Sequence, residues 1–501
     1  MRPRGAMFRW AKFCSVPQPT EMARNLQKIP SAEQHWLSES FVDPNGRLFE
    51  WRGEIYRVLE QEYSRRWYEL TFDGTLPKLM ADGLLIDSEL TQFRTESDKA
   101  VLRHRRVPVV SYCYEWTAGM LKDAALLTLD LCLRLADRGL TLQDGHPWNV
   151  LFEGTQPIYI DAGSIVPLRD DILWAPYQQF CNFFVFPLYL YAAGCDHTAR
   201  WLLRDYLHGV TDCDLRDGLP IMFKLRHPWR TLGVTLPRFA GNLLQRLPEE
   251  LQQRFLSLPA SIPASDDKSK LRLRFLESLR KNIASLKLSG GTSHWDNYYG
   301  TENRNYFQTN LSPGDWQKKH EAVENILAEL APHSVLDVGA NTGRYCKLAA
   351  QQGRRVTACE LDIAALTRCY EEARRGKLNI LPLAVNVFSD SPTPGRGGVP
   401  CPPPTQRLRS ELVMGLAVIH HVVAMQRLPV QRIVETFAAM SERWLLLEFV
   451  PPLTARIGAS PVANLDDYTG AQLEQCLKKY FSDVRLVPSY PEERQLFVCT
   501  K

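Results

Sequence analysis

The residues whose types and spacing most clearly indicate chemistry lie in one short segment, Val335-Leu-Asp-Val-Gly-Ala-Asn-Thr-Gly-Arg344. We expect a buried strand that ends at Asp337, followed by a glycine turn and a helix. Gly339 and Gly343 allow the backbone to turn sharply and to approach a ligand closely. A loop that leads into a helix also offers N–H groups to a polar ligand, because the first turn of a helix leaves them without helical partners. The segment therefore predicts a ligand-binding loop.

A second strand is predicted about twenty residues later, over Arg355-Val-Thr-Ala-Cys-Glu360. It ends in an acid, and a carboxylate at this position can accept hydrogen bonds from both hydroxyls of a ribose. The first segment has the spacing Asp-x-Gly-x-Asn-x-Gly, which differs from the Gly-x-Gly-x-x-Gly pattern of dinucleotide-binding proteins. The alternative interpretation is an ordinary strand–turn–helix connection that binds nothing.

The elements that must position these residues follow in the order of an α/β domain. We expect strands over 379–385, 411–419, 444–450, 484–487 and 495–499, with helices over 313–330, 362–375 and 468–480. Open α/β sheets bind their ligands at the carboxyl ends of the strands, where Asn386 and the pair His420-His421 fall. Two adjacent histidines should not both point the same way, so at most one faces the site. We predict His421 as a proton acceptor or substrate clamp, and a structural histidine is the alternative.

The glycine loop resembles the first motif of class I S-adenosylmethionine (AdoMet) methyltransferases. The final pair of strands is expected of that family and not of nicotinamide dehydrogenases, and the resemblance covers roughly residues 285–501. It implies a Rossmann-like domain with a mostly parallel seven-stranded sheet, in which AdoMet lies over the loop and its ribose is bound by Glu360. Asn386 would accept a hydrogen bond from the adenine amine, where the family often has Asp. The implied cofactor-binding residues are Asp337, Gly339, Asn341, Gly343, Glu360 and Asn386.

A second polar pattern lies in the first half, Leu142-Gln-Asp-Gly-His-Pro-Trp-Asn-Val-Leu-Phe152, followed by a short strand that ends at Asp161. It resembles the catalytic loop and the metal-binding Asp of protein kinases and aminoglycoside phosphotransferases. The resemblance implies that Asp144 is the base that orients or deprotonates a hydroxyl. Asn149 and Asp161 would hold Mg²⁺ on the phosphates of ATP, because hard oxygen ligands suit that ion.

The same region departs from these families in two respects. It has no glycine-rich phosphate loop before residue 100, and no strand that resembles Val-Ala-Ile-Lys, since Lys78 lies in Leu76-Pro-Lys-Leu-Met80. Three interpretations stay open: an active phosphotransferase, a relic that binds a nucleotide or a partner, and a kinase-like fold whose polar loop only ties a hairpin together.

The length of 501 residues predicts two to three domains. In the first half we expect a β-hairpin over 46–59, a helix and loop over 72–95, a strand over 107–114 and a buried helix over 121–136. The predicted domains are an N-terminal arm (1–40), a kinase-like α+β domain (41–211), a helical, proline-rich linker (212–290) and a methyltransferase domain (291–501).

Composition and patterning exclude several other classes of protein. The net charge of +4 is too small to indicate nucleic-acid binding. The twelve cysteines include no Cys-x-x-Cys pair, so neither a disulfide framework nor a zinc site is predicted, and a reducing cytoplasm is expected. The apolar run 180–195 is short for a membrane span of roughly twenty residues and predicts a buried helix. The helix predicted over 265–288 has a basic side that either meets an acidic partner or membrane surface, or is solvated between domains.

The order of motifs along the whole chain is more specific than either half alone. Glu115-Trp116, the Asp-x-x-Pro-x-Asn loop, Trp295-x-x-Tyr-Tyr299 and Gly-Ala-Asn-Thr-Gly343 follow one another. This order resembles bacterial two-part AdoMet-dependent methyltransferases, near rhizobial host-specificity nodulation proteins. It implies methyl transfer to an acceptor that the sequence does not identify. The alternatives are a non-catalytic AdoMet-binding regulator and a phosphotransferase fused to a methyltransferase module.

Overall fold

The computed structural model describes residues 27–37, 40, 45–168, 174–227, 266–288, 290–291, 293, 313–389, 395, 400–451, 468–488, 490 and 493–501. The chain forms two compact units, Met1–Asp82 with Ile86–Arg106, and Gly83–Leu85 with Val107–Lys501. Residues 1–26 of the predicted N-terminal arm, the aromatic motif at 295–299 and most of the proline-rich segment 391–404 lie outside the described residues.

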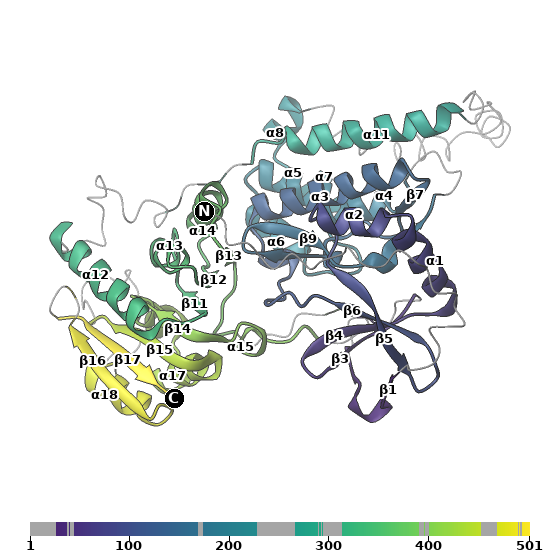
Figure 1. The fold of residues 1–501 in the computed structure, drawn as a ribbon. Coiled ribbons are helices and arrows are strands. Elements are labelled where there is room, and N and C mark those ends of the chain that lie inside the picture. Colours follow the sequence, from purple (N-terminus) through teal and green to yellow (C-terminus); the bar gives the residue numbers. More distant parts are fainter. Residues whose placement is uncertain are drawn as a thin grey trace. The chain divides into compact units, whose positions relative to one another are not determined.

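The first unit is built on a six-stranded sheet in the order β1-β5-β6-β4-β3-β2 (Figure 1). Its elements are β1 (Gln27–Ile29), β2 (His35–Trp36), β3 (Leu48–Trp51), β4 (Glu54–Val58), α1 (Gln61–Phe72), α2 (Thr75–Ala81), β5 (Ser88–Thr95) and β6 (Ala100–His104). The predicted hairpin is confirmed by the antiparallel pair β3–β4. The helix and loop expected over 72–95 are only half right, because the half-exposed segment 88–95 becomes a strand by pairing with β1 and β6.

The second unit begins with a mostly helical region. Its elements are η4 (Cys113–Glu115), α3 (Ala118–Ala136), β7 (Leu140–Leu142), η5 (Pro147–Asn149), β8 (Val150–Glu153), β9 (Gln156–Tyr159), η6 (Ala162–Ser164), β10 (Ile165–Pro167), α4 (Tyr177–Phe180), η7 (Cys181–Val185), α5 (Phe186–Ala192), α6 (Asp196–Leu202), α7 (Asp212–Gly218), α8 (Ile221–Arg226) and α11 (Asp266–Ala284). The buried helix predicted over 121–136 is confirmed as α3, whose N-cap Thr117 accepts a hydrogen bond from the Met120 N–H. The apolar run 180–195 is likewise a buried helical segment, and no helix in the described ranges is long and apolar enough to cross a membrane.

The strand predicted over 107–114 is wrong. This segment is irregular and ends in the one-turn helix η4, because the carboxylate of Glu115 accepts the N–H of Tyr112 and closes a local turn. A helix that caps itself in this way does not need a neighbouring strand to satisfy its backbone.

Helix α11 packs along α3. Arg280 on α11 forms an ion pair with Asp130 (2.5 Å), and the Lys122 ammonium donates to two carbonyls at the end of α11. The apolar face of α11 is buried through Leu276, Leu279, Ile283 and Leu286. Arg272, one of the basic residues of this helix, is also buried.

The rest of the second unit is a seven-stranded sheet in the order β13-β12-β11-β14-β15-β17-β16. Its strands are β11 (Ser334–Val338), β12 (Arg355–Cys359), β13 (Ile380–Leu383), β14 (Ser410–Gly415), β15 (Ser441–Phe449), β16 (Asp483–Pro488) and β17 (Gln495–Thr500). Only β17 runs against the others, and Figure 1 shows the β16–β17 hairpin in yellow at one edge of the sheet. The predicted mostly parallel seven-stranded sheet is confirmed.

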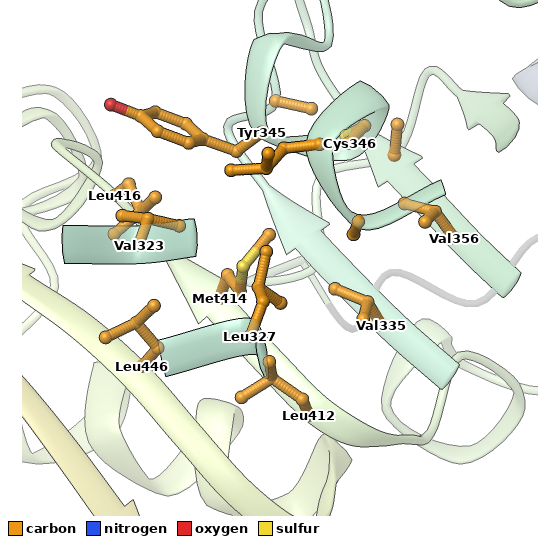
Figure 2. Packing of buried hydrophobic residues seen from close by; sticks show 14 of the residues in the cluster. Val323, Leu327, Val335, Tyr345, Cys346, Val356, Leu412, Met414, Leu416 and Leu446 are labelled. Carbon is orange, nitrogen blue, oxygen red and sulfur yellow. The ribbon is translucent and has the colours of Figure 1, made fainter. Parts of the chain in front are cut away.

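Helices cover the sheet and complete its core. They are α12 (Pro313–Leu330), α13 (Arg344–Gln351), α14 (Ile363–Gly376), α15 (Pro404–Arg407), α16 (Ile419–His421), η9 (Val422–Gln426), α17 (Val430–Met440) and α18 (Gly470–Leu477). Val323 and Leu327 on α12 pack with Val335 on β11 and with Leu412 and Met414 on β14 (Figure 2). Strands buried on both faces need apolar residues at successive positions, which explains why their sequences lack a polar alternation.

Candidate functional site

The predicted ligand loop connects β11 to α13 and is held in an unusual backbone conformation. Gly339, Asn341 and Gly343 have φ angles of 78°, 52° and 78°, which lie in the left-handed region. The N–H groups of Gly339 and Ala340 both donate to the carbonyl of Cys359 at the end of β12, at 2.9 and 3.1 Å. The loop is therefore fixed against the neighbouring strand, and glycine is needed at two of its positions.

Packing against neighbouring side chains also requires glycine at positions 339 and 343. A Cβ at Gly339 would lie 2.9 Å from a methyl group of Val418, and a Cβ at Gly343 would lie 2.5 Å from the sulfur of Cys369. Both distances are shorter than a side chain tolerates, so these positions are constrained by packing as well as by φ.

Glu360 stands directly after β12 and joins the loop to it. One carboxylate oxygen accepts the N–H of Asn341 at 2.8 Å, and the other accepts those of Leu361 (2.7 Å) and Asp362 (2.9 Å). Burial raises the pKa of Glu360, and these N–H donors oppose that rise. Since a carboxylate has about four lone-pair sites, one stays available. Accepting two ribose hydroxyls would therefore require the exchange of one backbone bond.

Asp337 lies in β11, behind the loop, and is 2% exposed. Its carboxylate accepts a hydrogen bond from the Cys346 thiol at 3.1 Å. Burial raises its pKa to about 6, and the nearby Glu360 charge adds to that rise. The structure thus brings Asp337, Asn341 and Glu360 together at the carboxyl ends of β11 and β12, as predicted.

Asn386 follows β13, and its side chain is held on both sides. Its Oδ1 accepts the N–H of Phe388, and its Nδ2 donates to the side chain of Gln426 on η9, both at 3.1 Å. An amide oxygen has a second lone pair, so this one retains the capacity to accept a further hydrogen bond. The contact with Gln426 was not predicted from the sequence.

The two histidines lie side by side, which corrects the expectation that they diverge. The strand expected over 411–419 ends at Gly415 as β14, Ala417 has a φ of 54°, and His420 and His421 belong to the one-turn helix α16. Their ring centroids are 4.1 Å apart. Burial lowers the pKa of both, and the charges of Arg494 and Lys319 lower that of His420 further. The Nδ1 atom of His420 is buried and has no hydrogen-bond partner among the described residues.

A buried cluster of three charged side chains was missed by the sequence reasoning. Lys319 on α12 donates to Glu448 on β15 at 2.6 Å, and Arg494 donates to the other oxygen of Glu448 at 3.4 Å. Their side chains are 2%, 0% and 6% exposed. Burial lowers the pKa of Lys319, and Glu448 opposes this change. The signal was a single acid in the apolar strand Trp444-Leu-Leu-Leu-Glu-Phe449, since a buried charge requires a partner.

The kinase-like loop gathers its predicted residues around the β8–β9 hairpin. The Asn149 amide donates to the hydroxyl of Tyr159 at 3.2 Å, and a carboxylate oxygen of Asp161 accepts the N–H of Gly163 at 3.1 Å. The N–H of Asp144 donates to the hydroxyl of Ser164 at 3.1 Å. Burial raises the pKa of Tyr159 well above its ordinary value, and the charge of Asp161 adds to this.

These contacts bring Asp144, Asn149 and Asp161 into one neighbourhood, but they tie the loop to protein groups. In the part of the chain that the structure describes, no three His, Cys, Asp or Glu side chains are placed to hold a metal ion. The predicted metal ligands are the amide of Asn149 and the carboxylate of Asp161, with Asp144 as the base, so these roles stay predictions.

The strand order of the sheet and the loop after β11 agree with the fold that the resemblance to class I methyltransferases implies. The chain is 29% identical to the nodulation protein NoeA of Rhizobium meliloti (strain 1021) over 429 residues, which cover 83% of this chain and 85% of that protein. The predicted resemblance to rhizobial nodulation proteins is confirmed by this similarity. No family model matches the chain.

Two groups of solved structures show a weaker likeness. The magnesium protoporphyrin IX methyltransferase ChlM from Synechocystis PCC 6803, solved with bound SAH, is 15% identical with a TM-score of 0.31, over 41% of this chain and 92% of that one. The bifunctional kinase-methyltransferase WbdD is 15% identical with a TM-score of 0.27, over 36% of this chain and 37% of that one. These scores are too low to carry an argument, so the fold assignment rests on the order of the strands.

Proposed function

We propose that this chain is an AdoMet-dependent methyltransferase. The observation that carries the proposal is the loop from Gly339 to Gly343, held in left-handed conformations against β12 and bonded to Glu360 through the N–H of Asn341. This arrangement stands at the carboxyl edge of the sheet, where α/β proteins bind their ligands.

The residues present offer partners for the ribose, the adenine and the positive charge of the cofactor. Glu360 retains a lone pair for a ribose hydroxyl, and the amide oxygen of Asn386 can accept from the adenine amine. Asp337, whose pKa is raised to about 6, would counter a positively charged ligand when it is ionised. The cofactor supplies a sulfonium-bound methyl group.

The protein's own task is then to position the acceptor. An in-line displacement from a sulfonium gains much of its rate from holding the reacting atoms at near-attack distance, so a strong acid–base pair is optional. His421 would accept a proton from the acceptor or clamp it. The lowered pKa values of His420 and His421 leave both imidazoles neutral near pH 7, and a neutral imidazole is able to accept a proton.

The candidate classes of methyl acceptor are a sugar, a lipid-linked glycan, a protein and a small molecule. The similarity to NoeA supports a role in bacterial host interaction or nodulation as part of the proposal. The cysteine pattern supports a cytoplasmic location.

The test uses the full chain. Calorimetric titration with AdoMet measures binding, and the release of S-adenosylhomocysteine in the presence of a broad acceptor panel measures transfer. We expect saturable binding and release with one acceptor class. Binding without release on any acceptor would favour the non-catalytic regulator, and absence of binding would overturn the proposal.

A phosphotransferase with a fused methyltransferase module is the second candidate. The gathering of Asp144, Asn149 and Asp161 around one hairpin favours it, whereas the bonds of Asn149 to Tyr159 and of Asp161 to Gly163 favour a loop that only supports the fold. A thermal-shift titration with Mg²⁺·ATP separates these readings.

A further inference from the structure

The sequence motif at Glu115-Trp116 has no role in the function proposed above, yet Glu115 is 3% exposed and contacts the methyltransferase region. Its backbone carbonyl accepts the N–H of Ala384 at 2.7 Å. Its carboxylate pairs with the guanidinium of Arg407 on α15 and accepts the N–H of Tyr112 at 3.0 Å. All three contacts lie within the second compact unit.

Arg200 on α6 makes the complementary contact. Its guanidinium donates to the carbonyl of Ala384 at 2.8 Å and to the carbonyl of Tyr114 at 3.1 Å. The N–H and the carbonyl of Ala384 are therefore both bonded to groups from the first half of the chain. Ala384 directly follows β13 and stands two residues before Asn386.

Arg407 also contacts the segment 110–115, which carries Glu115. It donates to the carbonyl of Val110 at 2.8 Å, and its guanidinium lies 4.8 Å from the centre of the Tyr112 ring. The side chains of Arg407 and Glu115 are 8% and 4% exposed. A buried, hydrogen-bonded ion pair is costly to break, so it favours one relative placement of the groups that it joins.

We propose that Arg200 and Glu115 are positioning residues for the adenine end of the AdoMet site. They act through Ala384 on the turn that carries Asn386, so residues 110–116 and Arg200 are part of the methyltransferase site. The inference rests on the proposed function. It revises the expectation that every group that serves the cofactor lies within 285–501.

The test compares the affinity of S-adenosylhomocysteine for the wild type and for Arg200→Gln, measured by calorimetry. The substitution removes the donor to Ala384, and one hydrogen bond is worth about a threefold to tenfold change in affinity. The matched control is Arg374→Gln. Arg374 on α14 pairs with Asp123 on α3 at 3.1 Å, so it joins the same two regions but does not contact Ala384. We expect its affinity to equal that of the wild type.

Two readouts separate positioning from a general loss of structure. The double variant Arg200→Gln/Asn386→Ala should bind no more weakly than Asn386→Ala alone, because Arg200 acts on the adenine contact only through Asn386. S-inosylhomocysteine, which lacks the adenine amine, should show no difference between the wild type and Arg200→Gln. Additive losses, or equal losses for both nucleosides, would overturn the inference.

Hydrogen exchange on the wild type keeps the test decisive if Arg200→Gln does not fold. Binding of S-adenosylhomocysteine should raise the protection of the amides in both 384–388 and 112–116, because the two segments are bonded to each other. Protection confined to 384–388 would overturn this inference but not the proposed function. A wild type that binds no S-adenosylhomocysteine would instead overturn the proposed function.

Discussion

Two polar loops of this chain look alike in sequence and differ in structure. Each follows a short strand, and each carries acidic and amide side chains at a spacing known from enzymes. In the loop after β11, the backbone itself is held in left-handed conformations, and Glu360 fixes it through the N–H of Asn341. In the loop at 144–149, the side chain of Asn149 is bonded to Tyr159 in the hairpin, and the N–H of Asp144 donates to Ser164.

Under the proposed function, one loop is a binding site and the other is a scaffold, so residue types and spacing alone would not distinguish the two. The backbone conformation and the partners of each polar group make the distinction. The loop after β11 is fixed through its backbone N–H groups. The loop at 144–149 is bonded to the hairpin through the side chain of Asn149. The following substitutions test this contrast.

The largest effect is expected for Lys319→Met, at the methyltransferase edge. Removing the ammonium leaves the buried carboxylate of Glu448 with one cation of the cluster, Arg494, at 3.4 Å. Loss of one member of a buried ion pair lowers the free energy of unfolding by about 3–5 kcal/mol. Urea unfolding measures this.

The control for this substitution is Arg485→Met. Arg485 pairs with Glu329 on the surface, with side chains 46% and 53% exposed, and such pairs contribute about 0–1 kcal/mol. Equal losses of stability in the two variants would contradict the structural role of the buried cluster.

The next effect concerns Gly343→Ala, with Gly353→Ala as its matched control. Both glycines have a positive φ, 78° and 82°, so both variants carry a left-handed penalty of roughly 1–2 kcal/mol. Only at Gly343 does the new Cβ meet another atom, the sulfur of Cys369 at 2.5 Å. We expect Gly343→Ala to lose AdoMet binding and additional stability. Identical stability and affinity in the two variants would show that the loop tolerates the displacement.

Glu360→Gln should weaken AdoMet binding by about tenfold to a hundredfold, because hydrogen bonds to a charged acceptor contribute roughly 1.5–3 kcal/mol. Thermal stability should also fall, since the carboxylate accepts three backbone N–H groups and an amide has only one oxygen. Glu372→Gln, which removes the partner of Lys347 on α13, is the control. An unchanged dissociation constant in Glu360→Gln would mean that Glu360 is not the ribose ligand.

The smallest effect on methyl transfer is expected for Asp161→Asn, in the kinase-like loop. We expect methyl release to be unchanged and the melting temperature to fall, because the N–H of Gly163 loses a charged acceptor. Mg²⁺·ATP should not raise the melting temperature of the wild type. A rise that disappears in Asp161→Asn would remove the contrast between the loops and promote the phosphotransferase.

The sequence predicted the seven-stranded sheet well because most of its strands are apolar runs, and three of them end at or directly before Gly339, Glu360 or Gly415. It also predicted the β3–β4 hairpin and helix α3. It failed where distant partners decide the structure. The segment 107–114 was taken for a strand, although Glu115 closes a turn there and pairs with Arg407, which is 292 residues away.

In the candidate site, too, local patterns were predicted and contacts between distant residues were not. Asp337, Asn341 and Glu360 were found from local spacing, and the structure brings them together. The cluster joins Lys319 to Glu448, 129 positions away, so the acid in the apolar strand 444–449 indicates that a partner is needed but not which residue it is. The pairing of the histidines was not predicted because the strand before them ends at Gly415, and Ala417, with a positive φ, precedes a one-turn helix.

The most direct test of the central claim is a calorimetric titration of the full chain with AdoMet, repeated with Glu360→Gln and Glu372→Gln. The account predicts saturable binding to the wild type, weaker binding to Glu360→Gln and wild-type binding to Glu372→Gln. No saturable heat with the folded wild type at millimolar AdoMet would contradict it.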